Sequence, residues 1–343
     1  MNILVRGTNW VGDAVMSVPA LCELRRLFPA ARIALHTRSW AEGIFRDAPF
    51  IDEIIAFDKT GSKFADAFSQ ARELKARRFE LAVLLPNSFE SALVAKLAGV
   101  PRRFGYAKEA RSFLLTDAVS IPPWKNERHE VFYYLHLIGE IERAYAGAPG
   151  VERTVPEPAL AVSDERRAAA RRFLIGAGFD LDRRVVALGV GSTNSRAKRW
   201  PADRYAALND RLQRELGAQV ALVGARDERE VAEEVFEKSA IKPIILTGKT
   251  NLAEAVAVLS EIDLLVSNDM GLAHIAPALG TKTLVIFGPT NELTTRPFSE
   301  NAEIIRRPVE CAPCMLRDCP IDHRCMNGIA PEEVFERAAT LLI

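Results

Sequence analysis

Short apolar runs alternate with longer amphipathic segments along the first half of the chain. Ala14, Val18 and Leu21 recur at helical spacing, whereas the apolar runs on either side have the length of buried strands. A strand followed by a crossover helix is typical of a parallel sheet. The predicted strands are Asn2–Arg6, Arg32–Leu35, Ile54–Phe57 and Leu81–Leu85, and the predicted helices are Ala14–Leu27 and Phe64–Ala76.

The same alternation begins again after a stretch of Gly, Pro and charged residues at Gly147–Pro158, which is typical of a linker. Its predicted strands are Val185–Gly189, Gln219–Gly224, Ile244–Leu246, Leu264–Ser267 and Thr283–Phe287, and its predicted helices are Tyr205–Leu216, Glu228–Lys238, Leu252–Ser260 and Leu272–Leu279. The pattern predicts two doubly wound, Rossmann-like α/β domains over residues 1–155 and 160–343. We expect them to face a central cleft at the carboxyl ends of their strands. The last amphipathic helix, 331–342, could pack back on the first domain.

Charge and composition narrow the class of protein further. Lys plus Arg and Asp plus Glu number 45 each, so no overall field draws the chain to nucleic acid. No stretch approaches the roughly 20 apolar residues of a membrane-spanning helix. Four of the five cysteines fall within Cys311–Cys325, unlike a dispersed disulfide framework. We therefore expect a protein of the reducing cytoplasm.

Two common nucleotide-binding motifs are absent. Thr247-Gly248-Lys249-Thr250 lacks the earlier glycine of a P-loop, because position 243 is Pro. Gly189-Val190-Gly191 lacks the third glycine of the dinucleotide fingerprint, because position 194 is Asn. A nicotinamide-dependent dehydrogenase is therefore disfavoured.

The loop Arg6–Asp13 leaves the first predicted strand and enters the first predicted helix. One interpretation is that Asp13 caps this helix, since Asp is favoured there and a carboxylate interacts well with the helix dipole. The other is that Asp13 is a general base, held at the cleft by a loop that glycines bound at each end. Both interpretations can hold together.

The loop Ser192–Pro201 follows the first strand of the second domain. Thr193 and Asn194 lead into three cations, of which Lys198 is the favoured candidate for contact with a diphosphate. A fixed ammonium stabilises the negative charge that grows on a departing phosphate. An ordinary solvated basic loop is the alternative.

The segment Ser267–His274 ends an apolar strand and starts a helix. Unpaired amides at a helix N-terminus bind anions, and Gly271 removes side-chain bulk there. Asp269 is positioned to accept from ribose hydroxyls. Leu272 belongs to the same helix start, and His274 lies about one turn inside it, although a single His is more often structural than ligand-binding.

Taken in order, Arg6–Asp13, Lys198–Pro201 and Asn268–His274 resemble the ADP-heptose:lipopolysaccharide heptosyltransferases of glycosyltransferase family 9. Arg128–Val131 and Cys311–Cys314 resemble the heptosyltransferase II group in particular. The resemblance spans nearly the whole chain. It implies a GT-B architecture, ADP-heptose bound by the second domain and a lipid-linked inner-core acceptor bound by the first.

The resemblance also implies roles for individual residues. Asp13 would deprotonate the acceptor and Lys198 would contact the donor phosphates, with direct, inverting attack and no metal required. The donor set that it implies is Thr193, Asn194, Lys198, Asp227, Asp269, Gly271, Leu272 and His274. Thr193 and Asn194 depart from the paired threonines of heptosyltransferase I, and Asp227 lies only near the position of that enzyme's ribose-binding Glu.

An acceptor set is expected in the first domain. Asn9 lies in the first loop, and Arg102, Arg103 and Arg111 are close in sequence, so they could meet anionic acceptor sugars or the inner membrane surface. A solvated basic face is an equal alternative. The expected location is the cytoplasm, peripheral to the inner membrane.

The cysteine spacing C-x₂-C-x₄-C-x₅-C is loosely compatible with tetrahedral zinc. Cys311, Cys314, Cys319 and Cys325 are therefore a candidate structural metal set, with a redox role or reduced structural thiols as alternatives. The functional hypothesis is an inverting heptosyltransferase that transfers heptose from ADP-L-glycero-D-manno-heptose to heptose I of the lipopolysaccharide inner core. The alternatives are another nucleotide-sugar enzyme on this fold and a non-catalytic nucleotide-sugar-binding protein.

Overall fold

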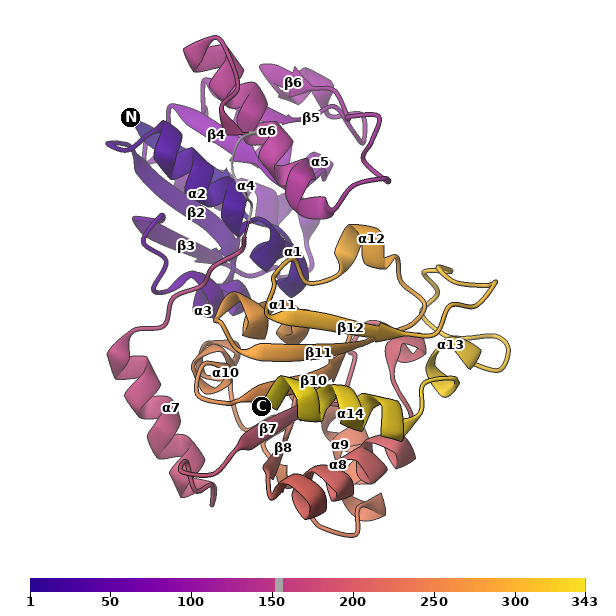
Figure 1. The fold of residues 1–343 in the computed structure, drawn as a ribbon. Helices are drawn as coiled ribbons and strands as arrows, with labels where there is room; N and C mark the ends of the chain where they lie inside the picture. The colour runs from indigo at the N-terminus through magenta and orange to yellow at the C-terminus, as the bar shows by residue number, and fades with distance from the viewer. Residues whose placement is uncertain (152–156, 343) are drawn as a thin grey trace. The chain divides into compact units, whose positions relative to one another are not determined.

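The apolar run at the start of the chain forms a buried parallel strand, β1 (Asn2–Arg6), as its composition predicts. The computed structural model describes residues 1–151 and 157–342, and the chain divides into two units, Met1–Pro158 and Ala159–Ile343 (Figure 1). Residues 152–156 of the predicted linker lie outside the described residues. None of the described helices is long and apolar enough to cross a bilayer.

The first unit is a six-stranded parallel sheet in the order β3-β2-β1-β4-β5-β6. Its helices α2 and α6 pack together on one face, and α4 and α5 pack together on the other (Figure 1). Alternate strand residues supply the two cores, with Leu4 and Leu84 facing α4 and α5. Its elements are β1, α1 (Val11–Met16), α2 (Val18–Leu27), β2 (Arg32–Arg38), α3 (Glu42–Phe45), β3 (Glu53–Phe57), α4 (Lys63–Lys75), β4 (Leu81–Leu84), α5 (Phe89–Leu97), β5 (Arg102–Tyr106), β6 (Asp117–Val119) and α6 (Glu130–Ala146).

The second unit repeats this plan with a sheet in the order β12-β11-β10-β7-β8-β9. Helices α8, α9 and α14 cover one face, and α7, α10 and α11 lie on the other. Its elements are α7 (Asp164–Gly176), β7 (Val185–Gly189), α8 (Ala202–Leu216), β8 (Gln219–Val223), α9 (Arg229–Lys238), β9 (Ile244–Ile245), α10 (Leu252–Leu259), β10 (Leu264–Asn268), α11 (Gly271–Ala278), β11 (Lys282–Phe287), α12 (Glu292–Thr295), β12 (Ala302–Arg306), α13 (Arg324–Asn327) and α14 (Pro331–Leu342). The prediction of two doubly wound α/β domains is confirmed.

Both sheets follow one topology. Counted from the first strand of each unit, the spatial order is 3-2-1-4-5-6, and every pairing is parallel. The order therefore reverses between β1 and β4 in the first unit and between β7 and β10 in the second. In sheets of this kind ligands bind beyond the carboxyl ends of the two strands at the reversal.

One prediction about the helices is wrong. The helix predicted over Ala14–Leu27 is two helices, because the Ser17 hydroxyl donates to the Ala14 carbonyl at 2.8 Å and Pro19 has no N–H to continue the ladder. The final helix belongs to the second unit. In α14, Val334 and Ala338 are buried in the core that α8 and the second sheet share.

Candidate active site

The loop at the reversal point of the first sheet holds its backbone close to β2. The Gly7 amide donates to the His36 carbonyl at 2.9 Å, and a Cβ at Gly7 would lie 2.8 Å from Thr37 Oγ1. Asn9 and Trp10 are exposed, and Trp10 is the N-cap residue of α1. Asp13 is therefore the third residue of α1 rather than its cap. It is half-buried, and the positive end of the helix dipole still favours its carboxylate.

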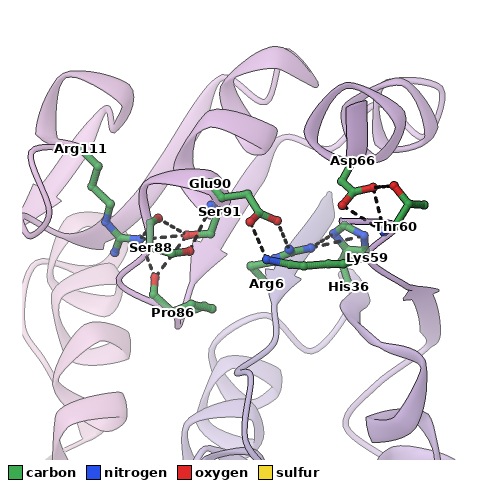
Figure 2. Close-up of polar contacts among 10 residues, drawn as sticks. All are labelled: Arg6, His36, Lys59, Thr60, Asp66, Pro86, Ser88, Glu90, Ser91 and Arg111. Atoms are coloured by element: carbon green, nitrogen blue, oxygen red, sulfur yellow. Dashed lines mark hydrogen bonds and ion pairs between the residues drawn. The ribbon is translucent and has the colours of Figure 1, made fainter. Parts of the chain in front are cut away.

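A buried arginine fixes the end of β1 beneath this loop (Figure 2). Arg6 stacks on Phe57 at 4.0 Å from the ring centroid and donates through Nη1 to His36 Nδ1 at 2.7 Å. Its Nη2 lies 3.6 Å from Glu90 Oε1, and Lys59 Nζ lies 2.6 Å from Glu90 Oε2. Burial lowers the pKa of Arg6 to about 10 and, with help from the Arg6 charge, lowers the pKa of His36 to about 2. At neutral pH Arg6 is charged and His36 is neutral.

A second arginine fixes the loop after β4. Arg111 is fully buried, and its Nη1 donates to the carbonyls of Pro86 and Ser88 and to Ser91 Oγ (Figure 2). Its Nε donates to the Tyr106 carbonyl. Burial lowers its pKa to about 10. Because three of these acceptors are backbone carbonyls, Arg111 positions backbone and does not present its charge on the surface.

The three arginines of the expected acceptor set therefore do not form one surface patch. Arg102 and Arg103 open β5, so they lie at the amino end of the sheet, opposite the loop after β1. Arg102 pairs with Asp117 at 2.5 Å, and Arg103 Nε donates to the Leu114 carbonyl at 2.7 Å. This strand is hard to predict from the sequence, because its first two residues are charged and only its remaining three are buried.

The reversal point of the second sheet brings a lysine and an aspartate together. Lys198 ends the short 3₁₀ turn Arg196–Lys198 after β7, and Asp269 directly follows β10. Lys198 Nζ lies 2.7 Å from Asp269 Oδ2, and Thr290 Oγ1, from the loop after β11, donates to the same oxygen at 2.7 Å. Three loops of the carboxyl edge thus converge on one buried carboxylate.

Asn268 fastens the loops after β7 and β10 to each other. Its Oδ1 accepts from the Trp200 amide at 2.9 Å and from Tyr205 OH at 3.0 Å, and its Nδ2 donates to the carbonyls of Val190 and Gly191. All four bonds that a buried amide side chain can make are present, which makes this position rigid. The sequence motifs assign no role to Asn268, although an amide at the end of an apolar strand is a signal that could indicate one.

Helix α11 begins at Gly271, directly after this junction. Its N-cap residue, Met270, supplies no side-chain hydrogen bond to the first amides. Leu272 and His274 are buried, and burial, together with the Lys198 charge, lowers the pKa of His274 to about 4 despite the opposing effect of Asp269. The cation at this helix start is therefore Lys198, and His274 is a neutral ring.

Comparison with known proteins decides the family. The profile of glycosyltransferase family 9 (heptosyltransferase) matches residues 67–324. The chain belongs to glycosyltransferase family 9. Over its full length it is 29% identical to lipopolysaccharide heptosyltransferase 2 of Escherichia coli K12, covering 99% of that protein, and 29% identical to lipooligosaccharide heptosyltransferase 2 of Haemophilus influenzae, again covering 99%.

Solved structures of heptosyltransferases have the same fold. The structure of E. coli ADP-heptose lps heptosyltransferase II aligns with a TM-score of 0.84 at 28% identity and covers 100% of this chain and 98% of that one. E. coli heptosyltransferase WaaC with ADP aligns with a TM-score of 0.73 at 18% identity, covering 99% and 100%. The predicted GT-B fold class and the family resemblance are confirmed.

The loop after β8 carries two neighbouring acids, Asp227 and Glu228, with different surroundings. Asp227 is exposed, whereas Glu228 is buried and its Oε2 accepts from the Ala225 amide at 2.8 Å. Thr193 Oγ1 lies 3.4 Å from Glu228 Oε1, and a Cβ at Gly191 would lie 2.2 Å from Glu228 Cδ. Burial raises the pKa of Glu228. Thr193 and Asn194 are exposed in the adjoining loop.

The four cysteines of the candidate metal set lie between β12 and α14 in this family 9 chain. Over residues 1–151 and 157–342, no three His, Cys, Asp or Glu side chains are arranged to hold a metal ion. Cys325 is buried, Cys319 is partly exposed, and Cys311 and Cys314 are exposed; all four are free thiols.

The segment that carries these cysteines braces the loops after β7 and β11. His323 Nε2 lies 2.6 Å from the Ala197 carbonyl, and the Ala197 amide donates to the Arg317 carbonyl at 2.9 Å. The amides of Cys314 and Met315 both donate to the Pro289 carbonyl, one residue before Thr290. One irregular segment therefore holds the loops that carry Lys198 and Thr290.

Replacing His323 tests this brace. His323→Ala removes the donor to the Ala197 carbonyl, so amide hydrogen exchange across residues 195–199 is expected to speed up about tenfold. His323→Gln keeps a donor and should exchange more like the wild type. Exchange is read by mass spectrometry, and equal rates at 195–199 in His323→Ala and wild type would contradict the brace.

Because His36 is buried and neutral, we predict that the first unit loses folding stability in acid. The pKa of His36 in the folded protein lies below its ordinary value of 6.5. The unfolded chain therefore binds a proton that the folded chain does not bind. Stability therefore falls as pH drops below about 6.5, and His36 contributes about 1.4 kcal/mol per pH unit between about pH 5.5 and 4. Urea unfolding at several pH values should give a shallower slope for His36→Asn. Parallel stability curves for the two proteins would refute the assignment.

Proposed function

We propose that this chain is an inverting glycosyltransferase that transfers heptose from ADP-L-glycero-D-manno-heptose to heptose I of the lipopolysaccharide inner core. The observation that carries the proposal is the Lys198–Asp269 pair at the start of α11, at the reversal point of the second sheet. Family membership and the names of the full-length relatives support the sugar and the acceptor class.

The second unit has the charges to bind a sugar diphosphate. Lys198 is a fixed cation, and the first amides of α11 point toward an anion bound at the helix start. The Lys198–Asp269 contact and the Thr290 bond hold the ammonium in place before the donor arrives. Preorganised donors of this kind stabilise the charge that grows on the leaving diphosphate. Thr193 and Asn194 extend the proposed donor set from the adjoining loop.

Asp13 is the proposed base. The acceptor hydroxyl gives its proton to the Asp13 carboxylate while its oxygen forms a bond to the anomeric carbon. The bond from that carbon to the diphosphate oxygen breaks, and its electron pair leaves with ADP. Because attack and departure take place on opposite faces, a single displacement inverts the anomeric carbon. Lys198 and helix amides balance the leaving charge, so we propose that the reaction requires no metal.

The acceptor is lipid-linked in this proposal, so the protein works peripherally at the cytoplasmic face of the inner membrane. Asn9, exposed in the loop that leads to Asp13, is the proposed acceptor contact. The two arginines at the amino end of β5 are no longer part of the acceptor set, because they lie at the opposite edge of the sheet.

Replacing Asp13 tests its role in catalysis separately from the binding of ADP. Asp13→Asn should lower kcat with ADP-heptose and a truncated lipopolysaccharide acceptor by about 10²- to 10⁴-fold and leave ADP affinity within about twofold. Lys198→Met is the matched control, because it should lower both kcat and ADP affinity. Both are measured by ADP release and calorimetry in the presence of EDTA.

Three results would refute the proposal. Wild-type kcat in Asp13→Asn excludes the base, and unchanged ADP affinity in Lys198→Met excludes the donor clamp. Wild-type protein that binds ADP-heptose without turning it over on any acceptor is a nucleotide-sugar-binding protein.

A further inference from the structure

Four exposed phenylalanines lie on the face of the first unit that α4 and α5 cover. Phe64 and Phe68 of α4 are 77% and 61% exposed, Phe89 at the start of α5 is 40% exposed, and Phe113 in the turn after β5 is 67% exposed. We call these four residues the aromatic face. Proteins that remain in water rarely expose so many large apolar rings on one surface unless it binds something.

The helix pattern explains why these rings point outward. In α4 the inward positions are Asp66, Ala67, Gln70, Ala71 and Leu74, all buried. Phe64 and Phe68 are one turn apart, so they share the opposite, outer side of α4. The Phe89 and Phe113 rings lie 6.0 Å apart and form the second pair, on the neighbouring helix and turn.

Cations accompany the rings. Lys96 Nζ lies 5.7 Å from the centroid of Phe113, and Arg72 and Lys75 are exposed along α4 beyond Phe68. The solvent-accessible acids of these two helices are each paired, Glu73 with Arg77 at 3.5 Å and Glu90 with Lys59 at 2.6 Å. Beyond these pairs, Arg72, Lys75 and Lys96 give α4 and α5 an excess of exposed positive charge.

The aromatic face borders the acceptor half of the proposed site. α4, α5 and the turn that carries Phe113 follow β3, β4 and β5, so they begin at the carboxyl edge where the loop to Asp13 also begins. Glu90, the residue after Phe89, contacts both Lys59 before α4 and Arg6 at the end of β1 (Figure 2). A continuous chain of contacts thus links both helices to the base of that loop.

We propose that the aromatic face docks the first unit on an anionic lipid bilayer. The Phe rings enter the interfacial layer, and Lys96, Arg72 and Lys75 meet lipid phosphates. This inference deepens the proposed function, because it supplies the surface by which the enzyme reaches a lipid-linked acceptor. The observations favour a bilayer over a second copy of the chain, since a two-fold contact through this face would bring its own cations together.

Vesicle binding tests the proposal directly. Wild-type protein should co-sediment with vesicles of phosphatidylethanolamine and phosphatidylglycerol, and more weakly with vesicles of phosphatidylethanolamine and phosphatidylcholine. Phe64→Ser/Phe68→Ser should weaken binding to the anionic vesicles by about tenfold, because it removes both exposed rings of α4. Arg72→Glu/Lys96→Glu should weaken it by about as much and make the remainder insensitive to salt.

Matched controls come from exposed residues of the second unit. Ile175→Ser/Leu216→Ser removes two exposed apolar side chains, and Arg172→Glu/Arg214→Glu reverses two exposed cations. Both controls should bind vesicles like the wild type. All variants should turn over a deacylated, water-soluble acceptor at the wild-type rate, because none of the substituted residues belongs to the proposed catalytic set.

The experiment distinguishes a failure of the docking proposal from a failure of the proposed function. Docking is overturned if wild type does not bind anionic vesicles, if Phe64→Ser/Phe68→Ser binds as wild type does, or if that variant only converts an oligomer to a monomer. Vesicle binding that depends on the aromatic face, without turnover of any acceptor by any protein, would keep the docking surface and refute the proposed function.

Discussion

The parallel direction of all strands is the constraint on which the site depends. In each sheet it places every carboxyl end at one edge, and the reversal of strand order sends successive crossovers to opposite faces. The loops after β1 and β4, and those after β7 and β10, therefore run to opposite faces of their sheets. The residues to which we assign chemistry lie in these loops or directly after them. Asp13 follows the first strand of its unit, whereas Lys198 and Asp269 follow the two strands at the reversal in the other.

Each reversal point is fastened by buried polar side chains that satisfy backbone groups. In the first unit the fasteners are the cations Arg6 and Arg111, and in the second they are Asn268 and the acid Glu228. Burying such groups costs free energy unless their hydrogen bonds are made, so each one specifies a single loop conformation. Rigid loops of this kind hold a base or an ammonium in position before a substrate binds.

The fold could be read from the sequence because strands buried on both faces appear as apolar runs. The run over Leu264–Ser267, for example, is β10 apart from one terminal residue. β5 was missed because two arginines open it and mask its buried half, Phe104–Tyr106. The break at Ser17 was missed because the helical spacing of apolar residues continues across it, whereas its causes are the Ser17 side-chain hydrogen bond and Pro19.

The site was less predictable because its residues act through tertiary contacts. The loop motifs located Lys198 and Asp269, but no spacing rule reports that they form an ion pair or that Thr290 joins them. The sequence also does not show which of two neighbouring acids is buried. Asp227 is exposed and Glu228 is buried, and only the packing of Gly191 and Gly224 against Glu228 distinguishes them. The cysteines follow a metal-like spacing, yet their segment contributes mainly backbone hydrogen bonds to the loops.

The central claim is that a nucleotide diphosphate binds at the reversal point of the second sheet, on Lys198 and the first turn of α11. Hydrogen exchange with and without saturating ADP measures this residue range directly. We predict slower exchange at residues 196–199 and 271–274, with little change across α4 and α5. Protection confined to the first unit, or none at 271–274 despite binding, would contradict the account.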